Sequence, residues 1–204
     1  ISSSDVNISN LYDLEISDVD NNGYQDLLVF NSEAIFVLEN YGSDTDWDYS
    51  LIANRLGNSD QSYFVLPDGS TQDLPFNTVG SSNISVGDLD GDSLDDIVLF
   101  SGIAPNEAAQ ISILKNNGDS TWGADVIAAD GIYGHLELVN SDGSTELISS
   151  SGVNISNLYD LEISDVDNNG YQDLLVYSGN NSLFVLENYG PDTDWDYSLI
   201  ANRL

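Results

Sequence analysis

Three short acidic segments carry the residues of this sequence that could do chemistry. Each places side-chain oxygens at loop positions 1, 3, 5 and 9, and a backbone carbonyl at position 7 would complete the set. Carboxylates that alternate along a tight turn converge on one point, which suits a hard cation with six to eight oxygen ligands. The predicted ligands are Asp18, Asp20, Asn22, Tyr24 and Asp26; Asp88, Asp90, Asp92, Leu94 and Asp96; and Asp165, Asp167, Asn169, Tyr171 and Asp173.

Calcium is the predicted cofactor, with one ion in each of the three segments. A flexible cage made only of protein oxygens tolerates irregular geometry, which favours calcium over magnesium. Soft transition metals are not expected, because the chain has no cysteine and a single histidine. An EF-hand would place a Glu at loop position 12, whereas this position holds Val29, Leu99 or Val176. The alternative is a solvated turn rich in Asp and Asn, and the threefold recurrence of the spacing favours a metal site.

Internal repetition organises the whole chain. Residues 148–204 nearly repeat residues 1–56, and residues 83–128 form a divergent version between them. The sequence therefore divides into a first repeat at 1–56 that lacks a leading hairpin, a hairpin plus second repeat at 57–131, and a hairpin plus third repeat at 132–204. No polar cap is visible at either end, so we expect the chain to be a window from a longer array.

Each repeat reads as four β-strands. In the first repeat, alternation around Leu14 and Ile16 precedes the acidic loop, and a short apolar run at 27–30 follows it. Asp-Gly pairs beginning at Asp68 and Asp142 predict tight turns in additional hairpins between the repeats. Long helical periodicity is absent. The predicted fold class is therefore all-β, with tandem four-stranded antiparallel blades and extra Asp-Gly hairpins.

The acidic loops and the strands after them resemble the FG-GAP/VCBS repeat family, known from integrin α-subunit propellers and from many secreted bacterial proteins. In the middle repeat the likeness runs through GDLDGDSLDDIVLF to ISILKNNGDSTW. The resemblance implies four-stranded blades with calcium in the loop that joins two strands. Because a propeller closes with four to eight blades, three repeats leave two arrangements, a β-propeller-like one and an open stacked array. Ser93 stands where the family has Gly, and a positive φ there would cost about 1 kcal/mol.

The composition excludes several classes of partner. The chain has 35 acidic and 3 basic residues, a formal net charge of -32, and 41% hydrophobic residues. Such a field repels nucleic acids and anionic lipid surfaces, and no apolar run reaches the roughly 18 residues of a membrane span. We therefore expect no nucleic-acid partner and no membrane insertion. The apolar content is sufficient for a folded core.

Three tryptophans occupy equivalent positions in the repeats, at Trp47, Trp122 and Trp195. They either pack between strands or repeats, or form a platform on which a sugar ring stacks. An enzyme is not expected, because an active site seldom recurs in nearly identical copies. The one histidine, His135, falls in a connecting hairpin.

These patterns predict a calcium-binding structural or adhesive repeat module outside the cell or on its surface. Extracellular calcium fills weak sites that cytosolic calcium would leave empty. Near-identical outer repeats favour a longer array or a self-assembling filament, in which many equal units give length or multivalency. The expected partners are copies of the chain or neighbouring repeats, with glycans or cell-surface proteins as further candidates. The alternative function is a carbohydrate-binding propeller.

Overall fold

The computed structural model describes most of the chain. The described residues are 11–31, 34–42, 47–55, 62–65, 68, 70–73, 83–101, 110–119, 121–129, 136–139, 144–149, 158–178, 182–190 and 195–202. The predicted turn at Asp142 lies outside them, and so does the side chain of Trp195.

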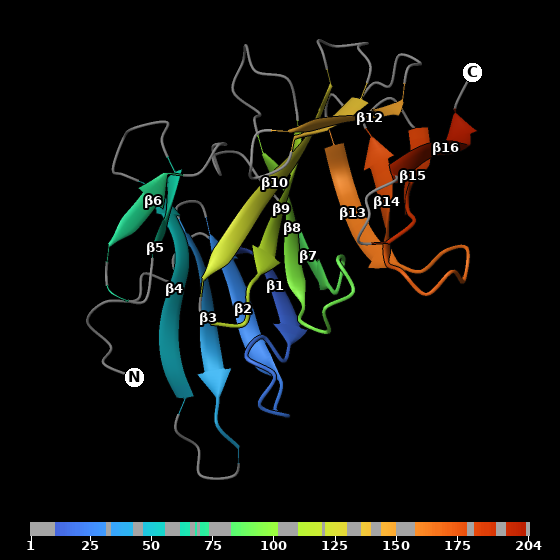
Figure 1. Ribbon diagram of the computed structural model, residues 1–204. Helices are drawn as coiled ribbons and strands as arrows, with labels where there is room; N and C mark the ends of the chain where they lie inside the picture. The colour runs from blue at the N-terminus through green and yellow to red at the C-terminus, as the bar shows by residue number, and fades with distance from the viewer. Residues whose placement is uncertain are drawn as a thin grey trace.

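The described strands form three antiparallel sheets that follow one another in chain order (Figure 1). The first sheet contains β1 (Leu11–Ser17), β2 (Asp26–Asn31), β3 (Ala34–Asn40), β4 (Trp47–Arg55), β5 (Ser62–Val65) and β6 (Thr71–Asp73). The middle sheet contains β7 (Ile84–Gly87), β8 (Asp96–Ser101), β9 (Gln110–Asn116), β10 (Trp122–Ala129), β11 (Leu136–Val139) and β12 (Thr145–Ser149). The third sheet contains β13 (Leu158–Ser164), β14 (Asp173–Ser178), β15 (Ser182–Asn188) and β16 (Trp195–Asn202).

The all-β prediction is confirmed. Each sheet is a meander in which every strand pairs with its neighbours along the chain, and none of the three sheets closes on itself. No helix in the described part of the chain is long and apolar enough to cross a membrane.

The extra hairpins belong to different repeats from those that the sequence suggested. β5 pairs with β4, and β11 pairs with β10, so each hairpin extends the sheet that precedes it. The sequence-based boundaries at 57–131 and 132–204 had attached each hairpin to the repeat that follows. The physical reason is that the hairpin satisfies the outer edge of β4 or β10 with hydrogen bonds, which a sequence repeat does not reveal.

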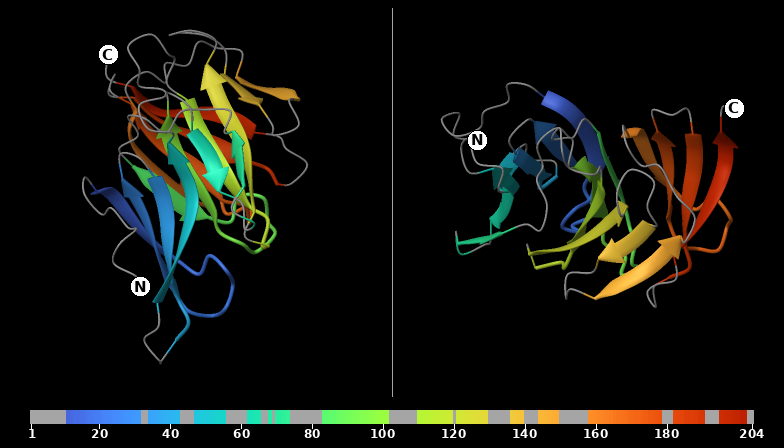
Figure 2. Two further views of the ribbon diagram at one scale, coloured as in Figure 1. Left: turned by 90° about the vertical axis from the view of Figure 1, so that its left-hand side faces the viewer. Right: turned by 90° about the horizontal axis from the view of Figure 1, so that it is seen from above.

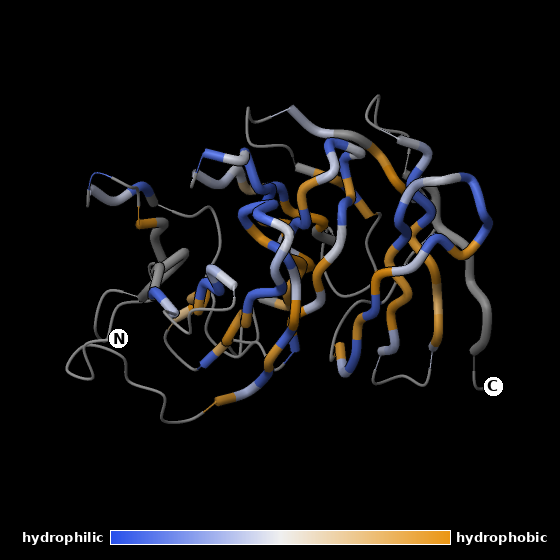
Figure 3. The backbone as a smooth tube through the Cα atoms, turned by 90° about the horizontal axis from the view of Figure 1, so that it is seen from below, coloured by the Kyte–Doolittle hydropathy of each residue, from blue (hydrophilic) through white to orange (hydrophobic). Residues whose placement is uncertain are grey.

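Successive residues of each strand face opposite sides of its sheet, and hydrophobic residues follow one another along many of the strands (Figure 3). We call one side the front face, and it carries Leu27 and Val29 in the first sheet. The other side, with Leu28 and Phe30, is the back face. Equivalent residues define the same two faces in the other sheets.

The sheets stack front to back, and the view from above shows them one after another in chain order (Figure 2). Between the first and middle sheets, Leu28 and Phe30 of the first back face pack with Ile97 and Leu99 of the middle front face. The second interface joins the middle back face to the third front face. Its buried side chains include Val98, Phe100, Ile111, Ile113, Leu161, Leu174, Val176 and Phe184. The middle sheet is therefore covered on both sides.

An asparagine at the end of the third strand of a sheet hydrogen-bonds the acidic loop of the preceding sheet. Asn116 Nδ2 donates to the Val19 carbonyl at 2.7 Å, and Asn188 Nδ2 donates to the Leu89 carbonyl at 2.7 Å. Both asparagines are buried, as are the side chains of Val19 and Leu89. Each interface thus combines an apolar core with one repeated polar contact.

We expect Asn116→Ala and Asn188→Ala to destabilise the fold by roughly 1–3 kcal/mol more than Asn40→Ala. Only the first two substitutions leave a buried carbonyl of a neighbouring sheet without its hydrogen-bond donor. All three asparagines also donate from Nδ2 to a carbonyl of their own sheet, that of Asp95, Gln172 or Gln25. Asn40 is the matched control because it makes this within-sheet bond, to the Gln25 carbonyl at 3.1 Å. Urea unfolding at a fixed calcium concentration measures the three losses. Equal losses in the three variants would contradict the inter-sheet role.

Candidate metal centres

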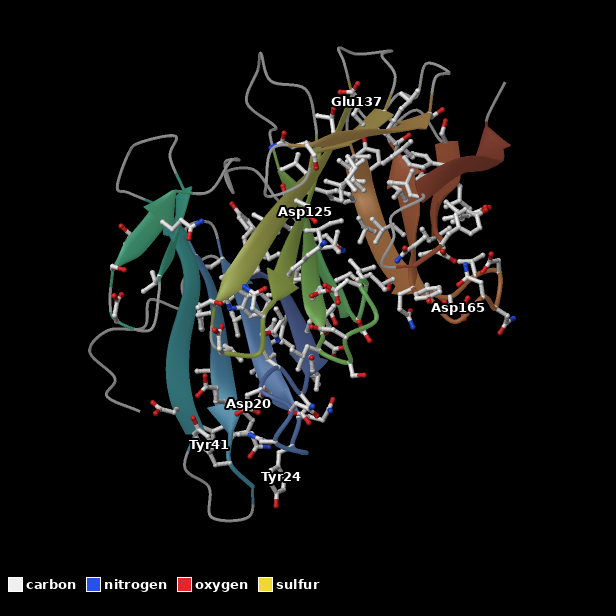
Figure 4. The ribbon with its side chains drawn as sticks, in the orientation of Figure 1. Asp20, Tyr24, Tyr41, Asp125, Glu137 and Asp165 are labelled. Carbon is white, nitrogen blue, oxygen red and sulfur yellow. The ribbon has the colours of Figure 1, made fainter. Side chains whose placement is uncertain are left out.

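Each acidic loop joins the first two strands of its sheet, and the loops emerge at the same end of the sheets. Figure 4 shows Asp20 and Asp165 at this end, and Glu137 at the opposite end. In each loop, three carboxylates offer oxygens that lie within 4.8 Å of one another. The groups are Asp18, Asp20 and Asp26; Asp88, Asp90 and Asp96; and Asp165, Asp167 and Asp173. The predicted positions 1, 3 and 9 therefore converge in all three repeats.

The third carboxylate of each group is buried and fastens the loop to the sheet. Asp26, 1% exposed, accepts hydrogen bonds from the backbone N–H of Val19 at 2.9 Å and of Asn40 at 2.7 Å. Asp96 and Asp173 accept from the equivalent residues at 2.8–2.9 Å. The loop start and the end of the third strand are thus held by one side chain.

The first carboxylate of each group shapes the turn itself. Asp18 accepts from the backbone N–H of Asn22 and of Gly23 at 2.9 and 2.8 Å, which folds the loop around the carboxylate. Such turns need residues with positive φ, which glycine and asparagine adopt most easily. Gly23 and Asn21 take φ of 89° and 55°. Ser93 takes φ of 75°, which confirms the strained conformation expected at that position.

The side chain at position 5 accepts a hydrogen bond from the backbone two residues further along the loop. Asn22 Oδ1 accepts from the Tyr24 N–H at 2.8 Å, and Asp92 Oδ1 accepts from the Leu94 N–H at 2.8 Å. The same bond recurs at Asn169. These side chains order the backbone of position 7, whose carbonyl was the remaining predicted ligand.

The side chain at position 7 anchors the loop against the turn after the third strand. A Cβ on Gly42 would lie 2.6 Å from the Tyr24 ring, and one on Gly190 would lie 2.6 Å from the Tyr171 ring. The glycines, with φ of 96° and 112°, admit this approach. Sequence reasoning missed both these glycines and the asparagines of the inter-sheet contact. Their signal was present as an Asn-X-Gly triplet that recurs at 40–42, 116–118 and 188–190.

The middle site has a basic neighbour that the outer sites lack. Lys115 forms an ion pair with the buried Asp125 at 2.7 Å, and the equivalent outer residues are Glu39 and Glu187. Burial alone would lower the pKa of the Lys115 ammonium, but the hydrogen bond to Asp125 and the charges of Asp125, Asp90 and Asp96 together raise that pKa above its ordinary value. The charge of Lys115 also acts on the middle loop, where it opposes the rise in the pKa of Asp90.

Burial and repulsion from neighbouring carboxylates disfavour the charged state of Asp26, Asp90 and Asp96. Burial, opposed by the backbone hydrogen bonds from Asn116 and Leu89 and reinforced by repulsion from Asp90, raises the pKa of Asp96 to about 7. Burial also raises the pKa of Asp26 above its ordinary value. A bound cation would relieve both effects, since it replaces lost hydration and neutralises the repulsion.

The tryptophans at equivalent positions differ in exposure. Trp122 is 8% exposed and packs in the interface between the first and middle sheets, whereas Trp47 is 38% exposed. Both lie opposite the asparagine at the end of the third strand, Asn116 or Asn40. The packing interpretation therefore holds at Trp122.

Comparisons with known proteins identify no family for this chain. No protein-family model matches it, and no curated protein matches it. A solved structure that it is similar to belongs to a lectin of Agrocybe aegerita, which specifically recognises non-reducing terminal N-acetylglucosamine. The identity is 14%, the TM-score is 0.37, and the match covers 97% of this chain and 67% of that chain. The likeness to FG-GAP/VCBS repeats stays a prediction.

We expect the metal-free protein to be less stable at pH 8 than at pH 5, and Asp96→Asn to remove much of this difference. The pKa of Asp96 is about 7 in the folded protein and near 3.8 when unfolded. The folded state therefore binds the proton more tightly, and the stability that this proton confers falls as pH rises through this window. Urea unfolding in chelator-treated buffer at several pH values measures how steeply the free energy of unfolding falls with pH. An unchanged slope in Asp96→Asn would refute the assignment.

Proposed function

We propose that this protein is a calcium-binding structural repeat module that works outside the cell, with an adhesive role at the cell surface. The single observation that carries the proposal is the convergence of three carboxylates in each of three equivalent loops. A lone acidic turn is common on protein surfaces. The same converging geometry in the divergent middle repeat and in both outer repeats supports a shared ligand.

The donor set suits calcium. Each group offers carboxylate oxygens, two from partly or fully exposed aspartates and one from a buried aspartate. Hard divalent cations take such ligands, and calcium accepts irregular, flexible oxygen cages. Positions 5 and 7 supply further oxygens from Asn22 and the Tyr24 carbonyl, and from their equivalents. The ion would supply charge neutralisation and order rather than reaction chemistry.

A structural role follows from the placement of the sites. Val19, between the first two carboxylates of its loop, is buried in the first interface and bonded there to Asn116. A cation that orders this loop therefore orders the contact between two sheets. Weak sites of this kind fill at the millimolar calcium found outside cells, which supports the extracellular location.

Carbohydrate binding is the second candidate, and the exposed Trp47 is the observation that favours it. Aromatic rings with one open face stack on sugars. The equivalent Trp122 is buried by a neighbouring sheet, however, and this weakens the case for a sugar platform. A glycan-array screen of the intact chain with and without Trp47→Ala distinguishes the two functions.

Calcium should raise the melting temperature of the protein. At calcium concentrations ten to a hundred times Kd, each site contributes roughly 1.4–2.7 kcal/mol, and each kcal/mol corresponds to about 2–4 °C for a chain of this size. Thermal unfolding with EDTA and with millimolar calcium measures the shift. Equal melting temperatures would refute the calcium proposal.

Two matched variants locate the effect in the loops. Asp20→Asn should reduce the calcium-induced stabilisation by about one third, because one of three sites is impaired. Glu162→Gln removes the same charge on β13, outside the acidic groups, and should leave the stabilisation unchanged. Equal behaviour of the two variants would show a general charge effect instead.

The middle loop should differ from its neighbours in calcium affinity. Four of its predicted ligands are carboxylates, because Asp92 stands where the outer loops have Asn22 and Asn169, and ligand charge tunes the affinity of such sites. We expect Asp92→Asn to weaken the middle site about tenfold, or roughly 1.4 kcal/mol. Isothermal titration calorimetry measures this, with Asn22→Asp as the reciprocal variant. The explanation fails if neither substitution changes an affinity.

A further inference from the structure

We propose that the front face of the first sheet is a docking surface, and that its occupant is the back face of a further sheet of the middle type. This inference goes beyond the proposed function and does not depend on the identity of the metal. The open front face, as we call this surface, consists of the exposed Leu14, Ile16 and Trp47 and the half-buried Asn40. Two residues at the centre of the same face, Val29 and Phe36, are buried.

The same sequence occurs twice in this chain, once docked and once not. The third sheet repeats the first almost residue for residue, and its front face packs on the back of the middle sheet. Leu161 is 2% exposed in that interface, whereas its equivalent Leu14 is 47% exposed. Ile163 likewise packs against the interface core, and its equivalent Ile16 is exposed. The chain itself therefore shows what this surface binds.

The polar contact of the interfaces is also half-formed on the open front face. Asn188 donates from Nδ2 to the Gln172 carbonyl of its own sheet and to the Leu89 carbonyl of the preceding sheet. Asn40 makes the first of these contacts, to the Gln25 carbonyl. Among the described residues, nothing takes the place of the Leu89 carbonyl. Docking of a further sheet would supply this acceptor.

Trp47 fits the same account. Its equivalent Trp122 becomes buried because the first sheet covers the front face of the middle sheet. The difference in exposure between the two tryptophans thus reflects whether a sheet lies in front of them. On the open front face, Trp47 adds a large apolar surface beside Asn40.

One residue selects the type of sheet that docks. Gly87, on the back face of the middle sheet, lies against Ile163, and a Cβ at this position would lie 2.9 Å from Ile163 Cγ2. The outer sheets have Ser17 and Ser164 at the equivalent position. A serine opposite Ile16 would therefore collide with it, because the Cγ2 methyl of isoleucine has no freedom to withdraw.

The open front face consequently favours a middle-type sheet over the third sheet of a second copy. The first interface shows the reverse combination of sizes. There Ser17 is on the back face, and the residue equivalent to Ile163 is the smaller Val86, which packs against that interface. Isoleucine with glycine and valine with serine are thus the two pairings in this chain.

In the test, a further middle-type sheet is fused to the chain, because a covalent link gives the two parts a high effective concentration. Ile1 corresponds to Ile148, so a copy of residues 83–147, which carries the strands of the middle sheet without the hairpin that belongs to the first sheet, reproduces the junction between the middle and third repeats when it is joined ahead of Ile1. The chain has no cysteine, so Leu14→Cys introduces a single thiol as a probe of the open front face. Leu147→Cys, at a side chain that is 55% exposed on β12, is the reference.

We expect the added repeat to slow alkylation of the thiol at position 14 by about tenfold or more, and to leave the reference thiol unchanged. Gly87→Ser in the added copy should abolish the protection. Combining it with Ile16→Val, which recreates the valine–serine pairing, should restore the protection. This rescue shows that the Gly87→Ser copy still folds.

Three results would overturn the proposal. The first is equal alkylation with and without the added repeat. The second is protection that survives Gly87→Ser. The third is protection of the unextended chain that grows with protein concentration, which would assign the surface to a second copy. Measurements at saturating calcium and in metal-free buffer separate this inference from the calcium proposal, since calcium-induced stabilisation can be present or absent whatever the thiol reports.

Discussion

The structure depends on one buried carboxylate in each sheet. Asp26, Asp96 and Asp173 each accept a backbone N–H from the acidic loop and another from the end of the third strand. A carboxylate without hydration is costly to bury unless its oxygens are hydrogen-bonded or neutralised. These two bonds meet part of that cost, and the neighbouring aspartates add repulsion that a cation would remove. The site and the fold therefore share the same atoms.

The buried carboxylate also connects the acidic loops to the stacking of the sheets. Asn116 donates its backbone N–H to Asp96 in its own sheet and its side-chain N–H to the Val19 carbonyl in the loop before it. Val19 stands between Asp18 and Asp20, and its side chain is part of the first interface. A disturbance of one loop thus reaches the next sheet through two hydrogen bonds. This gives a physical reason for the clustering of the acidic groups at this end of the sheets.

Small differences between the repeats keep them in alternating order. The middle repeat has Gly87 and Val86 where the outer repeats have serine and isoleucine. Close-packed interfaces are sensitive to single methyl groups, so each pairing fits its own neighbour and resists the other. Lys115, whose ion pair with Asp125 is specific to the middle repeat, adds a further distinction. Divergence of the middle repeat is therefore part of how the three sheets of this chain are ordered.

The sequence by itself determined the strands and the converging carboxylates. Alternation and turn residues act over a few neighbours, so the strand around 27–30 and the loop from Asp18 to Asp26 could be predicted from local pattern. Only the tertiary structure decided which sheet each hairpin joins, that Asn116 and Asn188 reach a neighbouring loop, and that Trp122 is buried while Trp47 is exposed. These features depend on contacts between residues far apart in the chain. A repeated sequence carries the same local signal whether or not another sheet lies against it, and the environment alone makes the difference.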